Sequence, residues 1–313
     1  MLIKIYRLIL KLCLIAFFAS CSTIQNAQDI LNYKITLASS EQNDTTTTSI
    51  ESKVDNQGRK ASLLVAFFGL DNGLPKIANK GVCPGAGGKD GMPVIFSHEI
   101  DVSTMQAGDF KVTLSSGKIG EVTCATLAPA DDKGELRTAL LAGEFGDSKD
   151  QPVKVEIVGN ILSIDGSLNF KGESIAATTL ESGPTIIFAE SIPQDQWELG
   201  KKGTSLRWGG GTGCPVGTKN IVGVTWVGGV TKPGGGEVTD KERQQYKISV
   251  KQLDDKMIEV IPFAIADLND GDNNHKLCLD VEGIPNSVFF PAGFLADPRG
   301  DLNPDTKIQI IEN

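Results

Sequence analysis

The sequence is poor in histidine, which limits the chemistry it can perform. Its only histidines are His98 and His275, so the common histidine-based catalytic and zinc sites have few residues from which to be built. His98 follows Ser97 in a strand-like pattern, where alternation predicts that the two side chains point to opposite faces. A Ser–His dyad is therefore not expected there, and we interpret His98 as structural and His275 as a turn residue.

Long apolar runs and an excess of basic residues are also missing. No run beyond residues 1–20 is long enough to span a bilayer. Residues 1–20 carry Lys4, Arg7 and Lys11 in an otherwise apolar stretch without acids, which is typical of a secretory signal peptide. Removing this segment changes the formal net charge from −9 to −12. Such acidity argues against nucleic acid as a partner and favours an exported protein that binds cations or stays soluble at a cell surface.

The signal segment ends in FASC at residues 18–21, which resembles the lipobox of bacterial lipoproteins. The resemblance implies a lipid-modified, palmitate-bearing Cys21 and a membrane partner reached through that anchor. Phe18 departs from the usual leucine, and Ser22 favours the outer membrane in families whose sorting rule reads this position. The alternative is an ordinary cleavage site followed by an unmodified cysteine.

Residues 21–60 are polar and include NDTTTTS and SSEQND. A segment of this composition cannot bury enough apolar surface to fold alone, so we expect a disordered tether between the anchor and the folded part.

From Ala61 onward, short apolar runs alternate with Gly-, Pro-, Asn- and Asp-rich turns, and long helical periodicity is absent. This spacing predicts an all-β protein made of sandwiches. The chain also repeats itself in order: Phe110–Leu114 matches Tyr246–Val250, Glu121–Val122 matches Glu259–Val260, and Val155–Gly159 matches Leu279–Gly283. We therefore predict two tandem domains, 61–178 and 179–313.

The stretch VIFSHEIDVSTMQAGDFKVTLSSGKIGEVT, residues 94–123, resembles bacterial immunoglobulin-like domains of exported surface proteins. The resemblance implies two tandem immunoglobulin-like β-sandwich domains, although the second copy departs from the motif. A fold of this kind does not by itself indicate a function.

Four cysteines belong to the folded part, and each predicted domain contains two of them. An even number in an exported chain favours disulfides, so we predict the pairs Cys83–Cys124 and Cys214–Cys278. A zinc site is the alternative, but none of these cysteines has a C-x-x-C partner.

Two acidic loops are candidate calcium sites, because calcium prefers several oxygen ligands. The first is DLNDGDNNH at 267–275, with ligand candidates Asp267, Asn269, Asp270 and Asp272. The second has the D-x-N-x-D spacing of Asp301, Asn303 and Asp305. The second loop is not a true EF-hand, since Thr306 replaces the turn glycine and KIQII reads as a strand. A polar turn is the alternative for the first loop, because a similar turn at 146–151 precedes the matching strand, although it does not explain the extra acids of this loop.

These features favour a lipid-anchored structural or binding module of the bacterial cell envelope, without catalysis and with a protein or carbohydrate ligand. The alternative from another class is an anchored hydrolase or carbohydrate-binding protein that acts on polysaccharide through carboxylates. It would present acids and the exposed side chains of Trp197 and Trp208 in a cleft between the domains.

The calcium prediction is tested by a thermal melt of the mature protein with calcium and with chelator. A site filled a hundredfold above its dissociation constant adds about 2.7 kcal/mol, a shift of several degrees. The shift should disappear in Asp270→Ala/Asp272→Ala if the first loop binds, and in Asp301→Ala/Asp305→Ala if the second does. Identical melts with calcium and with chelator would contradict the prediction.

Overall fold

The computed structural model describes residues 50–203, 211–268 and 271–312, and these belong to one compact unit. The lipidation candidate Cys21, the tether up to residue 49, Trp208, Asn269 and Asp270 lie outside the described residues. Among the described residues, none of the helices has the length and apolar character needed to cross a bilayer. The protein is all-β, as the sequence predicts, with only short helical turns.

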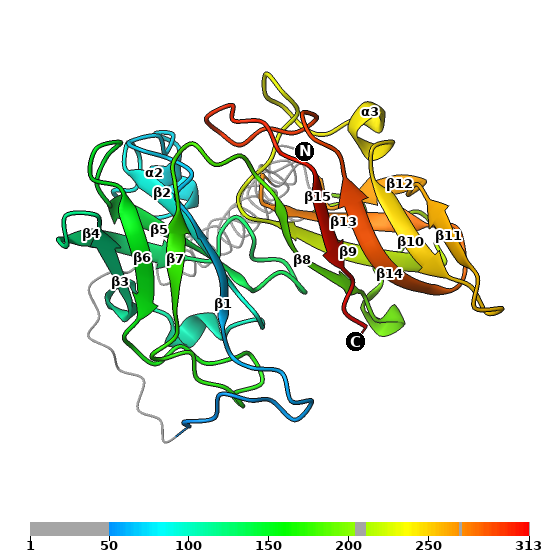
Figure 1. Ribbon diagram of the computed structural model, residues 1–313, viewed down its shortest axis with the longest axis horizontal. Helices are drawn as coiled ribbons and strands as arrows, with labels where there is room; N and C mark the ends of the chain where they lie inside the picture. Colours follow the sequence, from blue (N-terminus) through cyan, green and yellow to red (C-terminus); the bar gives the residue numbers. More distant parts are fainter. Residues whose placement is uncertain (1–49, 204–210, 269–270, 313) are drawn as a thin grey trace, which may run out of the picture. The chain divides into compact units, whose positions relative to one another are not determined.

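The first half of the chain forms a closed barrel rather than the expected sandwich. Its strands follow the order β1-β2-β5-β4-β3-β6-β7, and β1 closes the ring by pairing in parallel with β7. The bounds are β1 Leu63–Phe67, β2 Asp90–Phe96, β3 Phe110–Leu114, β4 Ile119–Thr126, β5 Thr138–Glu144, β6 Pro152–Ile157 and β7 Ser174–Thr178. The short helices are α2 Ala78–Gly81, η1 Val102–Thr104 and η2 Ala107–Asp109. These strands run from blue to green in Figure 1.

Alternation of buried and exposed side chains is clearest in β3 of the barrel. In β3, Phe110, Val112 and Leu114 are buried while Lys111 is exposed. This period of two directs every second side chain into the barrel, where Phe96 and Phe170 meet edge to face at 4.9 Å between ring centroids. Closure leaves these strands without a free sheet edge, which the alternation alone does not predict.

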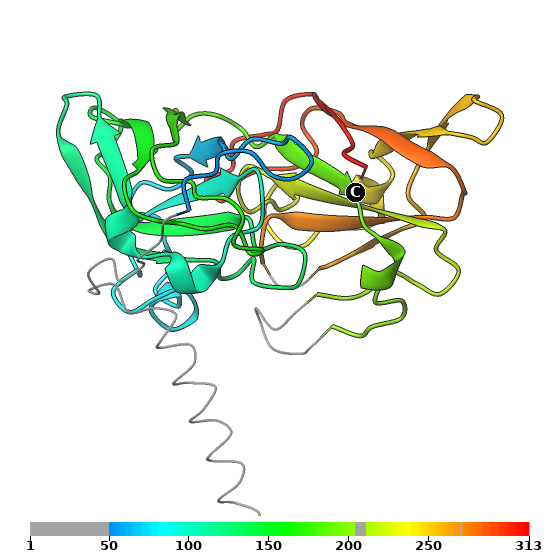
Figure 2. The same cartoon turned by 90° about the horizontal axis from the view of Figure 1, so that it is seen from below.

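The second half forms two four-stranded sheets, β11-β10-β14-β15 and β12-β13-β9-β8. Its strands, green to red in Figure 2, are β8 Ile186–Ser191, β9 Asn220–Trp226, β10 Lys247–Lys251, β11 Met257–Val260, β12 Ala264–Ala266, β13 Asn274–Leu279, β14 Ile284–Phe290 and β15 Thr306–Gln309. The short helices are η3 Gln194–Gln196 and α3 Asp240–Arg243. Both sheets contribute to one core, which contains Trp226 and Leu277 from the second sheet and Ile248 and Phe290 from the first. We call this half the two-sheet unit.

The internal repeat holds for one hairpin and fails for the third matched segment. β3 pairs antiparallel with β4, and the matched β10 pairs antiparallel with β11. However, β3 is flanked on its other side by β6, whereas β10 is flanked by β14 and not by the matched β13. The loops at 146–151 and 267–275 therefore precede strands with different partners. The turn at 146–151 no longer explains the polar residues of the loop at 267–275.

Both predicted disulfides are present. Cys83 is bonded to Cys124 in the barrel, and Cys214 is bonded to Cys278 in the two-sheet unit. All four cysteines are buried. Cys278 belongs to β13, so the second bridge fixes the loop that precedes β9 to the centre of its sheet.

The barrel and the two-sheet unit share a small apolar cluster. Val65, Phe67 and Ile95 of the barrel pack with Val227, which follows β9. Gly228 permits this approach, because a Cβ there would lie 2.9 Å from the Phe67 ring. Asn273 adds a polar link, since its side-chain amide donates to the Trp226 carbonyl at 2.6 Å and to the Thr138 hydroxyl at 3.2 Å.

A buried polar chain crosses the core of the two-sheet unit. Trp226 Nε1 donates to Tyr246 Oη at 3.0 Å, and Tyr246 Oη lies 2.8 Å from His275 Nδ1. Burial lowers the pKa of His275 to about 4, so the ring is neutral and Nδ1 can accept a hydrogen bond from the tyrosine hydroxyl. His275 is therefore a core residue of β13 and not the turn residue that the sequence predicts.

Tyr246→Phe should destabilise the protein by about 2–4 kcal/mol, because it leaves the indole N–H and the imidazole nitrogen buried without a partner. Urea unfolding of the variant and the wild type measures this difference. A change below about 0.5 kcal/mol would contradict the assigned hydrogen bonds, since a surface substitution has an effect of that size.

Candidate functional site

A polar cleft of about 250 Å³ lies between the barrel and β8 of the two-sheet unit. The barrel contributes Asp55, Ser97 and His98, and β8 contributes Phe188 and Glu190. Ser97 Oγ is 2.8 Å from His98 Nδ1, and His98 Nε2 is 3.2 Å from Asp55 Oδ2. The three side chains thus form a continuous serine–histidine–aspartate chain.

The contact between Ser97 and His98 corrects the expectation that their side chains point to opposite faces. β2 ends at Phe96, and the two residues lie in the bend that follows it. Strand alternation does not extend into a bend, so neighbouring side chains can turn toward each other. The two residues are adjacent in the sequence, but their side chains meet only because the strand ends before them.

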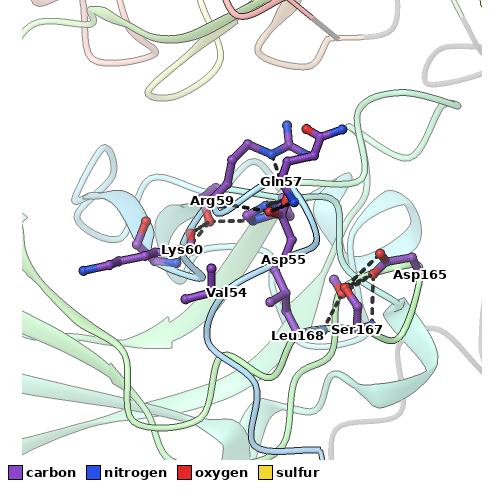
Figure 3. Close-up of polar contacts among 12 residues, drawn as sticks. Val54, Asp55, Gln57, Arg59, Lys60, Asp165, Ser167 and Leu168 are labelled. Atoms are coloured by element: carbon purple, nitrogen blue, oxygen red, sulfur yellow. Dashed lines mark hydrogen bonds and ion pairs between the residues drawn. The ribbon is translucent and has the colours of Figure 1, made fainter.

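Asp55 is held in position by its own tight turn (Figure 3). Its Oδ1 accepts hydrogen bonds from the backbone N–H groups of Gln57 and Arg59, each at 2.8 Å. Its Oδ2 accepts from Arg59 Nε at 2.7 Å and faces His98. Gly58 closes the turn at a φ of 78°, a conformation that favours glycine.

The electrostatics of this chain keep histidine neutral and aspartate ionised. Burial lowers the pKa of His98, Arg59 and Arg137 lower it further, and the hydrogen bond to Asp55 opposes them only in part. Burial raises the pKa of Asp55, but the hydrogen bonds from Arg59 and Gln57 outweigh it and hold that pKa well below its usual range.

Arg137 connects this cleft to the two-sheet unit. Its guanidinium donates to the Ser97 carbonyl and to Glu190 Oε1, each at 3.2 Å, and stacks 3.8 Å from the centre of the Phe188 ring. Arg137 is buried, so its charge depends on these partners.

A second cluster, next to the cleft, contains buried charges. Lys276 Nζ of β13 is 2.8 Å from Glu135 Oε1 of the barrel and 3.1 Å from Asp267 Oδ2 of the loop after β12. Glu135 and Asp267 are 4% and 2% exposed, so both carboxyls have almost no contact with water. Asp267 also has a φ of 66°, a left-handed conformation that is uncommon for a residue other than glycine.

The cluster contains two carboxyl groups and one amine, so protonation of a carboxyl group is favoured. Burial, followed by the neighbouring Glu135 carboxyl, raises the pKa of Asp267. Burial also raises the pKa of Glu135. For Lys276, burial lowers the pKa, but the two carboxylates outweigh it and raise the pKa, so the ammonium form persists.

A metal ion is a weaker fit than the lysine. One oxygen each from Asp132, Glu135 and Asp267 lie within 4.8 Å of one another, as in a metal site. The Lys276 ammonium already contacts two of the three, and a cation would have to displace it. We therefore interpret the cluster as an ion network with Lys276 as its cation.

Two predicted ligands of the first calcium loop belong to the described residues, Asp267 and Asp272, and the carboxyls of both lie beside Glu135. Asp267 faces Lys276, whereas both oxygens of Asp272 accept hydrogen bonds from Asn274. Calcium binding at this loop stays a prediction.

In the second loop, two of the three predicted ligands bind the backbone, whereas Asp301 Oδ2 lies 3.4 Å from Arg299 Nε. Asn303 Oδ1 accepts from the N–H groups of Phe294 and Leu295, and Asp305 Oδ1 accepts from Ala292. The D-x-N-x-D spacing does not include the neighbouring Asp297, whose Oδ1 accepts three backbone hydrogen bonds across the turn that leads to Asp301. Calcium binding here also stays a prediction.

A larger cavity of about 430 Å³ lies beside the shared apolar cluster. Its walls include the apolar side chains of Phe67, Leu70, Leu74, Leu127 and Leu140 from the barrel, and Gly228 from the two-sheet unit.

The described tryptophans do not form the sugar-stacking surface considered from the sequence, and the second candidate, Trp208, lies outside the described residues. Trp226 is buried, and Trp197 Nε1 donates to the Ile192 carbonyl at 2.8 Å in a half-buried position.

No protein-family model and no curated protein matches this sequence. Among solved structures, the N-terminal part of the bacterial S-layer protein SbsC is similar at 10% sequence identity, with a TM-score of 0.27. The match covers 82% of this chain and 45% of that one, so the chain spans less than half the length of this neighbour. At this TM-score, the likeness carries no argument about fold or function.

Glu135→Gln should make the protein more stable than the wild type at alkaline pH. The raised pKa of Glu135 means that the native state holds a proton the unfolded state has lost, so its contribution falls as pH rises through the native pKa. Glutamine does not ionise, so the variant does not lose stability in this way. Its free energy of unfolding should exceed that of the wild type by on the order of 1–3 kcal/mol at alkaline pH and should differ little at acidic pH.

Urea unfolding across the pH range measures this difference. Glu144→Gln is the matched control, because Glu144 forms an exposed ion pair with Lys89 and should have little effect at any pH. Equal pH dependence in Glu135→Gln and the wild type would contradict the buried ion network.

Proposed function

We propose that this protein is a lipoprotein of the bacterial cell envelope that works as a binding module. The signal segment and the lipobox-like sequence ending in Cys21 support export and anchoring. Two buried disulfides agree with an oxidising compartment outside the cytoplasm. Within this proposal, the two-sheet unit is a domain of the immunoglobulin-like kind, and the anchor is in the outer membrane.

The observation that carries the binding role is the 430 Å³ cavity beside the junction of the two halves. A cavity of this size can enclose a small molecule. Its leucine and phenylalanine walls favour a compact apolar ligand, because burying apolar surface is the main gain available there. A sugar fits less well, since it would need polar partners and an aromatic platform.

The positions of the described carboxyls argue against the alternative of a polysaccharide hydrolase that uses paired carboxylates. Such an enzyme needs two carboxyls that face an open cleft. Among the described residues, Glu135 and Asp267 are close together, but both are buried and paired with Lys276. The carboxylates that line the polar cleft each bond to a neighbouring protein group; they are Asp55, Glu99, Asp165 and Glu190.

Binding can be tested with the neutral apolar dye phenylnaphthylamine, whose fluorescence rises in apolar surroundings. We expect saturable binding to the wild type and at least tenfold weaker binding to Leu70→Trp, which fills the cavity from its wall. Leu253→Trp is the matched control, because Leu253 is 96% exposed and does not line the cavity. Equal binding to both variants, or no saturable binding to the wild type, would contradict the proposed site.

Anchoring is tested by metabolic labelling with palmitate. The wild type should carry the label and fractionate with membranes, whereas Cys21→Ala should lose the label. Cys13→Ala is the matched control, since Cys13 lies inside the signal segment and its loss should leave labelling intact. An unlabelled, soluble wild type would refute the lipid anchor.

A further inference from the structure

The serine–histidine–aspartate chain in the polar cleft has no part in the proposed binding role. We propose that Ser97 Oγ is a nucleophile for acyl transfer, activated by His98 and positioned by Asp55, and that the cleft hydrolyses small carboxylic esters. The relevant signature is a nucleophile within hydrogen-bond reach of a base that a third group orients, whatever the order of the residues in the chain.

Asp55 determines which nitrogen of His98 carries the proton. An ionised carboxylate can only accept, so the nitrogen that faces it, Nε2, holds the hydrogen. Nδ1 then has a free lone pair and faces Ser97 Oγ at 2.8 Å. This is the tautomer in which histidine can take the serine proton.

The other contacts of Ser97 are compatible with this role. The Lys60 carbonyl is a competing acceptor at 3.1 Å, but it is farther from Oγ than His98 Nδ1 is. The Ser62 N–H donates to Oγ at 3.0 Å and uses one of its two lone pairs. The second lone pair is available for attack on an acyl carbon.

The charges around His98 agree with a base that is ready at neutral pH. The charged groups that face it are Asp55, Arg59 and Arg137, and their combined effect with burial keeps its pKa below the ordinary value. His98 is thus neutral before attack, and the ionised Asp55 stabilises the imidazolium that forms.

The size of the cleft limits the substrate. A volume of about 250 Å³ is below the range of drug-sized ligand pockets, which indicates an ester with a short acyl chain. The neighbouring Ser163, Asp165 and Gln196 make the walls polar, in contrast to the apolar cavity.

The reaction balances with water as the second reactant. Ser97 Oγ forms a bond to the acyl carbon while its proton moves to His98 Nδ1, and the carbonyl π electrons move to oxygen. Collapse of this intermediate breaks the ester C–O bond, and the leaving alkoxide takes the proton from His98. Water then attacks the acyl-serine by the same steps, which releases the acid and restores Ser97.

The direct test is labelling of the full mature protein with a fluorophosphonate probe, followed by peptide mapping, together with hydrolysis of p-nitrophenyl acetate. We expect the probe on Ser97 and ester hydrolysis above that of the denatured protein. Ser97→Ala should lose both, and His98→Ala should lower the rate of each by about a hundredfold or more. Ser115→Ala is the matched control, because Ser115 pairs with Asp150 and should retain both signals.

Asp55→Asn separates a positioning role from a purely structural one. Loss of the carboxylate removes a group that raises the pKa of His98, so the midpoint of the pH–rate profile should move to lower pH. An unchanged midpoint with a lower rate would refute the role of Asp55.

The nucleophile proposal itself has a clear negative result. It is overturned if the folded wild type takes up no probe on Ser97, or if His98→Ala labels as fast as the wild type. The melting temperature of each variant is measured as well, so that loss of folding is not mistaken for loss of activity. The outcome is independent of dye binding and of palmitate labelling.

Discussion

One half-buried ammonium group joins the two halves of this protein. Lys276 Nζ of β13 lies between Glu135 of the barrel and Asp267 of the two-sheet unit, at 2.8 and 3.1 Å. Without this cation, two buried carboxyls would face each other, and ionising either of them would cost several kcal/mol. The halves are therefore coupled by a charge requirement, to which the apolar cluster around Phe67 and Val227 adds close packing.

The barrel segment that carries Glu135 also builds the two hollows. Residues 127–130 and Thr138 line the apolar cavity, while Gly134 and Arg137 line the polar cleft. Arg137 lies two residues after Glu135 and reaches both the Ser97 carbonyl and Glu190. A substitution in the ion network should therefore alter both candidate sites, because one stretch of chain contributes to the network, to the apolar cavity and to the polar cleft.

The sequence predicts this structure where the cause is local. Alternation and turn chemistry give the strands. The two disulfides join residues 41 and 64 positions apart, but an even cysteine count in each half already predicts their pairing. Barrel closure could not be predicted, because it depends on the parallel pairing of Ala66 with Ala177, far apart in the chain. The same holds for Lys276 and Glu135, which are separated by 141 residues. The Ser97–His98 contact was missed for a local reason, since the strand ends one residue before it.

The most direct test of this account is calorimetric unfolding of the mature protein and of Lys276→Met. We predict one transition for the wild type, with a calorimetric enthalpy equal to the van't Hoff enthalpy, as for a single cooperative unit. Lys276→Met should unfold in two separate steps, because the barrel and the two-sheet unit retain their own cores. Two independent transitions in the wild type, or a single unchanged one in Lys276→Met, would contradict the view that the Lys276 ammonium couples the two halves.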